Sequence, residues 1–216
     1  MRDLRRLNAH LVTDRQLSRG RSTIEVVQAA VDGGVDVVQL REKDLSTREF
    51  YREALALKEF LQRREVIFII NDRVDMAMAL DAHGVHLGQT DMPVSVARKL
   101  LGEEKIIGLS VEEPEHALKE EAQYADYLGV SPIFVTSTKP ELQRGWGLEG
   151  LRALRSMTEK PLVAIGSIKT DNAAAVIEAG ADSVAVVSCI TYAQDPKAAA
   201  MDLVAEVKRG KSQRIM

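Results

Sequence analysis

Charged side chains follow several apolar segments of strand length, at the point where each segment ends. Arg41 and Lys43 follow the segment 36–40 and are two residues apart, so both can face the same side of an extended chain. Two converging cations suit a phosphate or diphosphate, which Arg binds through a bidentate fork and Lys as a point charge. Taken alone, this segment is explained equally well by local salt bridges to Glu42 and Asp44.

Two carboxylates form a second candidate group. Asp72 and Asp91 each follow one of two consecutive apolar segments, 66–70 and 84–87. Neighbouring strands lie about 5 Å apart, so two acids at their ends can share one cation. Mg²⁺ is usually bound by few carboxylates together with water and substrate phosphates. Each Asp by itself is better explained as a helix cap or turn residue, but beside the two cations a metal site is the stronger interpretation.

Glycine and hydroxyl residues mark the last two strand ends. Gly166-Ser167 follows the segment 162–165, and Val187-Ser188 lies at the end of the segment 183–187. In barrel enzymes the loops at these two positions commonly cradle a phosphate with backbone N–H groups. We therefore predict a phosphate subsite there.

A long loop precedes these two strands. It covers residues 131–147, and loops of this length in a compact domain tend to be functional. Its middle supplies three hydroxyls and a cation, namely Thr136, Ser137, Thr138 and Lys139. We interpret Trp146, the one tryptophan, as a packing anchor for the loop.

These residues need a scaffold that brings many strand ends together. Eight apolar segments alternate with amphipathic ones, and they span 7–13, 36–40, 66–70, 84–87, 106–109, 127–130, 162–165 and 183–187. Continuous apolar runs are typical of strands covered on both faces, and intervening helices require parallel pairing. Helices are expected over 23–31, 48–61 and 198–207. We predict a single α/β domain, a (β/α)₈ TIM barrel over residues 1–216, with an open doubly wound sheet as the alternative.

The composition limits the class of protein. With 45% apolar residues, 28% charged residues and a net charge of −3, the chain is typical of a globular protein and not of a nucleic-acid binder. No segment approaches the ~18 apolar residues of a membrane span. The single cysteine excludes a disulfide framework and favours a reducing compartment. We expect a cytoplasmic enzyme with small-molecule partners and no nucleic-acid or membrane partner; the oligomeric state, a homo-oligomer included, is open.

Four motifs, in this order along the chain, resemble those of thiamine-phosphate synthases. They are Gln39-Leu40-Arg41-Glu42-Lys43, Asn71-Asp72-Arg73, His86-Leu87-Gly88-Gln89-Thr90-Asp91 and Thr136-Ser137-Thr138-Lys139. The resemblance covers nearly the whole chain. It implies Mg²⁺-dependent transfer of the 4-amino-2-methylpyrimidin-5-ylmethyl group from its diphosphate to the ring nitrogen of a thiazole phosphate. The products are thiamine phosphate and pyrophosphate, and the displacement is dissociative, or carbocation-like.

The resemblance also implies a role for each site residue. The residues that would bind the pyrimidine diphosphate are Gln39, Leu40, Arg41, Glu42, Lys43, Asn71, Ser110 and Lys139, with Arg41, Lys43, Ser110 and Lys139 catalytic. Those that would bind the thiazole phosphate are Thr136, Ser137, Thr138, Gly166, Ser167, Val187 and Ser188. Asp72 and Asp91 would hold one Mg²⁺ per subunit. The family usually has Gly-Gly where this chain has Gly166-Ser167, so Ser167 would be strained if its position requires a positive φ.

Two other functions are the alternatives. A thiazole tautomerase on the same barrel would lack the complete hydroxyl–lysine motif and would place a His near the end of the fifth strand. Here the segment 108–112 contains no His, and His116 lies farther along. A non-catalytic sensor of phosphate ligands would need no paired acids with a basic loop, and it would release no pyrophosphate.

Overall fold

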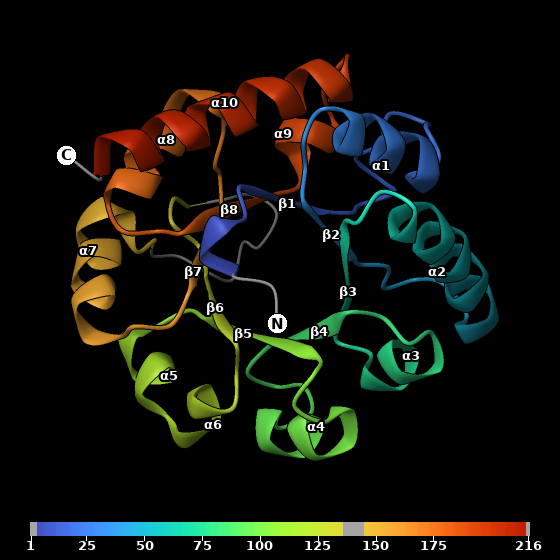
Figure 1. The fold of residues 1–216 in the computed structure, drawn as a ribbon, viewed down its shortest axis with the longest axis horizontal. Helices are drawn as coiled ribbons and strands as arrows, with labels where there is room; N and C mark the ends of the chain where they lie inside the picture. Colours follow the sequence, from blue (N-terminus) through green and yellow to red (C-terminus); the bar gives the residue numbers. More distant parts are fainter. Residues whose placement is uncertain (1–3, 136–144, 215–216) are drawn as a thin grey trace.

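The computed structural model describes residues 4–135 and 145–214, and its eight parallel strands form a closed barrel. Each strand pairs with the next along the chain, and β8 closes the ring by pairing with β1 (Figure 1). The strands are β1 (Ala9–Val12), β2 (Val37–Leu40), β3 (Ile67–Asn71), β4 (Gly84–Leu87), β5 (Ile106–Val111), β6 (Tyr127–Val130), β7 (Leu162–Ile165) and β8 (Ser183–Val186). The predicted TIM barrel is confirmed. Because β1 and β8 are hydrogen-bonded, the open doubly wound sheet is wrong.

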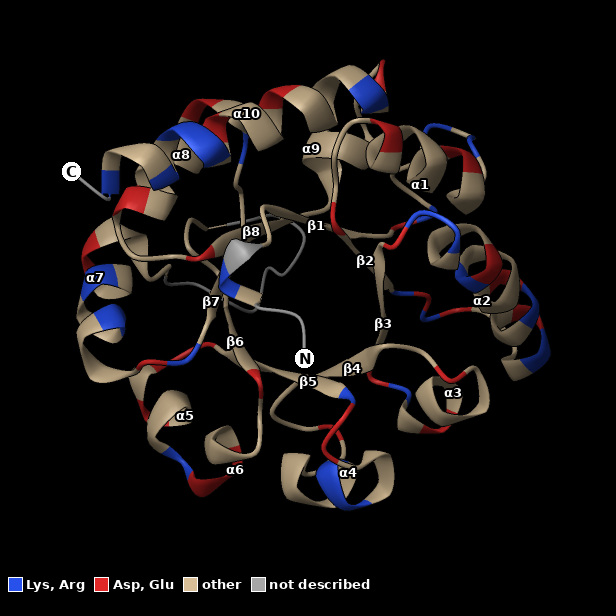
Figure 2. Ribbon diagram, in the orientation of Figure 1, with Lys and Arg blue, Asp and Glu red and all other residues tan. Residues whose placement is uncertain are grey.

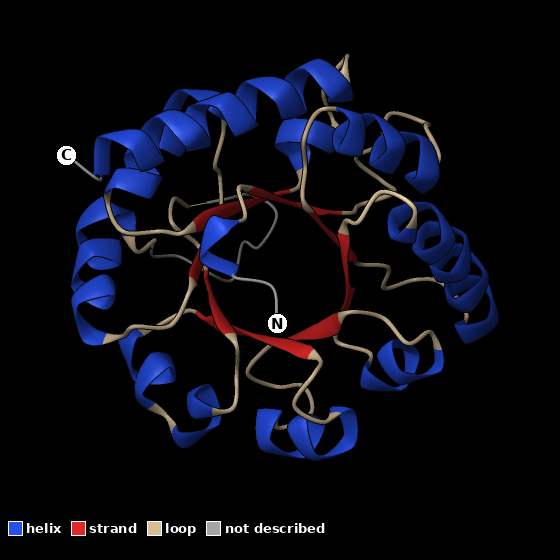
Figure 3. Cartoon of the chain, viewed as in Figure 1, coloured by secondary structure: helices blue, strands red, loops and turns tan. Residues whose placement is uncertain are grey.

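Helices surround the ring of strands, as Figure 3 shows. They are α1 (Thr23–Asp32), α2 (Thr47–Gln62), α3 (Val74–Ala79), α4 (Val94–Leu101), α5 (Pro114–Leu118), α6 (Glu120–Gln123), α7 (Gly147–Met157), α8 (Thr170–Glu178), α9 (Ser188–Thr191) and α10 (Pro196–Arg214). The expectations for α1 and α2 are confirmed. The helix expected over 198–207 is longer, because Gly210 lets α10 approach the backbone of Ala174 closely and the contact with α8 continues past the amphipathic segment.

Two of these helices begin at capping boxes that the sequence encodes. The Ser22 hydroxyl accepts a hydrogen bond from the N–H of Glu25, and the Glu25 carboxylate accepts one from Ser22 N in return. Ser46 and Glu49 repeat the arrangement at the start of α2. These caps satisfy N–H groups that the first helical turn leaves without partners.

Side chains alternate between the barrel interior and the layer under the helices. Val37, Ile67 and Ile69 belong to the interior cluster, whereas Phe68 and Ile70 pack under the helices. Because the side-chain period of a strand is two, this parity also points Gln39, Asn71 and Ser110 inward at the carboxyl ends of β2, β3 and β5. These three predicted site residues therefore face the same space.

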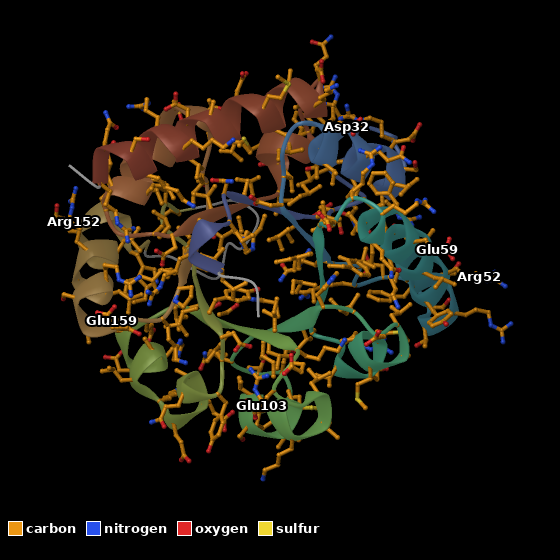
Figure 4. All side chains as sticks on the ribbon, viewed as in Figure 1. Asp32, Arg52, Glu59, Glu103, Arg152 and Glu159 are labelled. Carbon is orange, nitrogen blue, oxygen red and sulfur yellow. The ribbon has the colours of Figure 1, made fainter. Side chains whose placement is uncertain are left out.

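The charges in the described part of the chain begin where the strands end. None of the eight strands contains Lys, Arg, Asp or Glu, and Figure 2 shows charged residues on the helices and loops. Many of those on the helices simply face solvent. Figure 4 shows Arg52 and Glu59 of α2 and Arg152 of α7 pointing away from the barrel.

A short 3₁₀ helix, η1 (Leu4–Arg6), lies at the amino-terminal mouth of the barrel and inside the ring of strands in the view of Figure 1. Leu4 and Leu7 pack against the interior cluster. Lys211 Nζ donates to the carbonyls of Arg5 and Leu7, at 3.2 and 2.6 Å. This end is thus filled, and a site that uses the interior has to open at the other end.

Across residues 4–135 and 145–214, no helix has the length and apolar character needed to cross a membrane.

Candidate active site

The rim after β2 carries the first candidate cation, Arg41. Its backbone N–H donates to the hydroxyl of Thr13 at 2.9 Å, and its guanidinium lies 3.9 Å from the carboxylate of Asp14. The ion pair is thus made with the rim after β1, and not with Glu42 or Asp44 as the local alternative proposed. Because Asp14 is a distant partner, the guanidinium keeps donors available for a phosphate.

The rims after β3 and β4 bring Asp72 and Asp91 together. Burial, and then the neighbouring carboxylate of Asp91, raise the pKa of Asp72 to about 6. Lys43 and Arg41 oppose this rise, so both cations lie near the pair. Asp72 does not cap α3, which begins after Arg73 without a side-chain cap. The helix-cap explanation of Asp72 is therefore wrong.

The backbone holds both acids in place. Asp72 has a φ of 62° and donates its N–H to the carbonyl of His86 at 2.9 Å. Asp is one of the few residues that tolerate this left-handed conformation. Asp91 Oδ2 accepts a hydrogen bond from the N–H of Gly88 at 2.6 Å, so the explanation of Asp91 as a turn residue is confirmed. One carboxylate oxygen closes the turn, and the carboxyl group still meets Asp72.

The donor set fits a magnesium ion. Two carboxylates in contact repel each other when both are ionised, and a shared divalent cation removes that cost. Among the described residues, no group of three or more His, Cys, Asp and Glu side chains could hold a metal by itself. A cation between Asp72 and Asp91 would therefore complete its shell with water and substrate oxygens, the arrangement that Mg²⁺ prefers.

Ser110 lies inside the rim of β5 and is held by two neighbours. Its hydroxyl is 2.9 Å from Nε2 of His86, whose Nδ1 is 2.9 Å from the hydroxyl of Tyr127. Its carbonyl accepts from Nε2 of Gln89 at 2.7 Å. His86 is therefore a packed residue with a hydrogen-bonding partner at each ring nitrogen. The role of Gln89 was missed, because nothing in the spacing shows that its amide turns back to β5.

Two glycines make room for these rings. A Cβ at Gly129 would stand 2.7 Å from Cε1 of His86, and one at Gly108 would collide with the rings of Tyr127 and His86. The His86 and Tyr127 rings are stacked with centroids 5.5 Å apart. Burial raises the pKa of Tyr127 beyond its usual range. The phenol therefore stays neutral and can hydrogen-bond the imidazole.

The backbone after β7 has the positive φ at Ser167 that would strain this residue. Gly166 has a φ of 111°, and Ser167 has a φ of 51°. The Ser167 hydroxyl donates to the carbonyl of Val135 at 2.9 Å, and Asn172 Nδ2 donates to the carbonyl of Ser167 at 3.1 Å. The position therefore does require a positive φ. Hydrogen bonds at both of its oxygen atoms hold the serine there.

The rim after β8 leads directly into α9. Val187 packs beside the interior cluster, and Ser188 is exposed at the first position of the helix. The other end of α9 is held by Arg21, which donates to the carbonyls of Thr191 and Ala193. Sequence reasoning missed Arg21, because its partners lie about 170 residues along the chain and no spacing rule connects them.

Some predicted contacts have a different placement. Leu40 is fully buried in the layer between strands and helices, so its side chain points away from the rim and only its backbone can meet a ligand. Trp146 packs against the core and the backbone of Gly150, as an anchor would. The four residues Thr136, Ser137, Thr138 and Lys139 lie outside the described residues.

Comparison with known proteins decides the family. A model of the family described as thiamine monophosphate synthase matches residues 9–190. A thiamine-phosphate synthase of Albidiferax ferrireducens is 54% identical over 93% of this chain and 91% of its own. One of Chloroflexus aurantiacus is 52% identical over 92% of this chain and 91% of its own. The chain belongs to the thiamine monophosphate synthase family. Like other members, it is an enzyme of the transferase class.

Solved structures agree with this family membership. The thiamine phosphate pyrophosphorylase of Pyrococcus furiosus superimposes with a TM-score of 0.88 at 39% identity, covering 96% of this chain and 99% of that one. A 3-hexulose-6-phosphate synthase superimposes with a TM-score of 0.70 at 18% identity, which shows a shared barrel fold alone.

Proposed function

We propose that this enzyme transfers the 4-amino-2-methylpyrimidin-5-ylmethyl group from its diphosphate to the ring nitrogen of a thiazole phosphate. Thiamine phosphate and pyrophosphate are the products. The observation that carries the proposal is the contact between Asp72 and Asp91 beside Arg41 and Lys43, because it supplies both a cation site and the charges that a diphosphate needs. The names of the relatives, all thiamine-phosphate synthases, support the same substrates.

The residues of this site suit a dissociative displacement. The bond between the exocyclic methylene carbon and the diphosphate oxygen breaks first, and the pyrimidine amino group stabilises the cation that remains. Arg41 and Lys43 stabilise the charge that grows on the departing pyrophosphate. Mg²⁺, held by Asp72 and Asp91, would neutralise part of the same charge.

The second half of the reaction needs position more than acid–base chemistry. The thiazole nitrogen is already a nucleophile, and it forms a bond to the methylene carbon without losing a proton. A monophosphate bound at Ser167 and at Val187–Ser188 would aim that nitrogen across the mouth of the barrel. The reaction therefore needs no general base. This is consistent with the placement of His86, because its two ring nitrogens lie within hydrogen-bonding distance of Tyr127 and Ser110.

The direct test is an assay of the purified protein with both substrates, with and without Mg²⁺. We expect thiamine phosphate and pyrophosphate in equal amounts, and neither product without Mg²⁺. Asp91→Asn and Lys139→Ala should each lower turnover by about 10²-fold or more with the fold intact. Absence of product at saturating substrates would refute the synthase. Thiazole isomerisation alone would favour the tautomerase, and ligand binding without release of pyrophosphate would favour the sensor.

The expected cytoplasmic location stays a prediction.

A further inference from the structure

The segment between β1 and α1, residues 13–22, contacts the rims on both of its sides. Toward β2, Asp14 pairs with Arg41, and Gln16 Nε2 donates to the carboxylate of Asp44 at 3.4 Å. On the other side it meets the chain that follows β8. We call this stretch the β1–α1 segment. It therefore touches the rim predicted for the pyrophosphate and the carboxyl end of α9, the helix that begins at the place predicted for the thiazole phosphate.

Arg21 makes the contact with the chain after β8. Its Nη2 donates to the carbonyls of Thr191 and Ala193 at 2.9 and 2.8 Å, and its Nη1 to the carbonyl of Gln194 at 3.3 Å. Its Nε donates to the carbonyl of Ser18 at 2.9 Å. All three nitrogens of the guanidinium therefore have backbone partners, so Arg21 serves the protein and is not itself a phosphate ligand.

Ser18 in turn fixes the base of Arg21. Ser18 is buried, with 2% exposure, and its hydroxyl oxygen lies 2.6 Å from the carbonyl oxygen of Arg21 and 2.7 Å from that of Arg15. Arg15 is itself paired with Glu53 of α2. The guanidinium thus extends from an anchored loop, and it can fix the position of the backbone that it binds, at Thr191 and Ala193.

The element that Arg21 binds is short, and its position depends on contacts with the rest of the protein, including the buried side chains of Ile190 and Thr191. α9 has four residues, about 6 Å of helix, and a helix this short is not stable by itself in water. The carbonyls at its carboxyl end lack partners within the helix, and a cation is the favourable group for them. Because α9 begins at Ser188, any shift of the helix also shifts Val187 and Ser188.

We propose that Arg21 is a positioning residue for the phosphate of the thiazole substrate. It holds the carboxyl end of α9, and through the helix it fixes the backbone of Val187 and Ser188 at the rim. This inference rests on the proposed function, which places that phosphate there. It assigns a role in substrate binding to a residue that would not touch the substrate.

The test compares Arg21→Met, Arg21→Lys and the control Arg209→Met in steady-state kinetics. Methionine keeps the apolar stem of Arg21 and removes every donor; lysine keeps the charge but reaches fewer carbonyls. Arg209 is a half-exposed cation of α10, paired with Glu206 and close in sequence to Lys211, which binds the opposite mouth of the barrel. Its variant therefore loses the same charge away from the rim.

We expect Arg21→Met to raise KM for the thiazole phosphate about tenfold, because a shift of Val187 and Ser188 would cost the substrate phosphate about one charge-assisted hydrogen bond. KM for the pyrimidine diphosphate should stay within about twofold of the parent value. Arg21→Lys should lie between Arg21→Met and the parent, and Arg209→Met should match the parent. An equal rise in both KM values, or no rise for the thiazole phosphate, would overturn the proposal.

Hydrogen–deuterium exchange gives a readout that does not depend on activity. In Arg21→Met, the backbone amides of 188–194 should exchange faster than in the parent, while those of β2 should not change. Unchanged exchange in 188–194 would refute the role of Arg21 even if the parent makes thiamine phosphate. A parent that makes no product would refute the proposed function, and faster exchange would still show that Arg21 holds α9.

Discussion

The hydroxyl of Ser110 lies 2.9 Å from Nε2 of His86, on the neighbouring strand. Since Ser110 is a predicted contact of the pyrimidine diphosphate, the imidazole sets the direction of a group that would meet substrate. We expect His86→Phe, which keeps a ring but removes both nitrogens, to lower kcat/KM by about 10- to 100-fold. Tyr127→Phe, which removes one hydroxyl and keeps the ring stack, should cost less. Steady-state kinetics and thermal unfolding of both variants would measure this.

A double-mutant cycle separates this role from simple packing. If His86 acts through the Ser110 hydroxyl, His86→Phe combined with Ser110→Ala should be little worse than the poorer single variant. Fully additive losses in kcat/KM would mean that His86 acts by another route.

Magnesium should stabilise the folded protein even without substrate. A cation that binds Asp72 and Asp91 in the folded state alone adds about 1.4 kcal/mol to the free energy of unfolding at ten times its Kd. Asp91→Asn should abolish this gain. It should also stabilise the metal-free protein, because Asp72 loses a like-charged neighbour. Thermal unfolding with MgCl₂, against NaCl at the same ionic strength, measures both effects. Equal Mg²⁺ stabilisation of parent and variant would place the ion elsewhere.

Stability should depend on pH through Glu42. Burial and the charge of Glu53 raise its pKa from 4.5 to about 7. Asp14 adds to the rise, while Arg15 and Arg41 oppose it. Between these two pKa values the folded state binds more protons than the unfolded state, so stability falls as the pH rises. Glu42→Gln should therefore be more stable than the parent above pH 7, by about 1 kcal/mol after solvent screening.

Urea unfolding at about pH 5 and about pH 8 would measure the Glu42 effect. The gain from Glu42→Gln should be present at the higher pH and nearly absent at the lower one. Glu59→Gln, an exposed change on α2 (Figure 4), serves as the control and should show no such difference. A Glu42→Gln gain that is equal at both pH values would contradict the assignment.

Replacements of Ser167 should separate backbone strain from hydrogen bonding. Ser167→Gly relieves a positive φ but loses the bond to Val135, and each effect is worth about 1 kcal/mol, so stability should hardly change. Ser167→Ala keeps the strain and loses the bond, so it should destabilise the fold by about 1 kcal/mol. Chemical unfolding would show the order. Since both variants keep the backbone N–H, neither should raise KM for the thiazole phosphate more than about threefold.

The parts of this structure that follow from local rules were predictable. Continuous apolar runs such as 66–70 indicated buried parallel strands, and the barrel then placed the ends of neighbouring strands together. The contact between Asp72 and Asp91 follows from that adjacency alone. Their proximity could thus be inferred from the sequence.

Other parts depend on side-chain direction or on distant partners. The amide of Gln89 turns back to β5, and Arg21 binds carbonyls near the other end of the chain. Periodicity does not encode either choice, because both residues lie in loops. The sequence showed that Ser167 would be strained if its φ were positive. It could not show the sign of that φ, because the path of the backbone between β7 and α8 decides it.

The stacked rings of His86 and Tyr127 fit into space that Gly108 and Gly129 leave open, and this has a consequence for how the family can vary. A larger residue at either glycine requires a smaller one in place of a ring on another strand. We therefore expect these four positions to change together among relatives, as one covarying unit. In a library that randomises them one at a time, functional variants should be rare, whereas paired exchanges should recover the barrel.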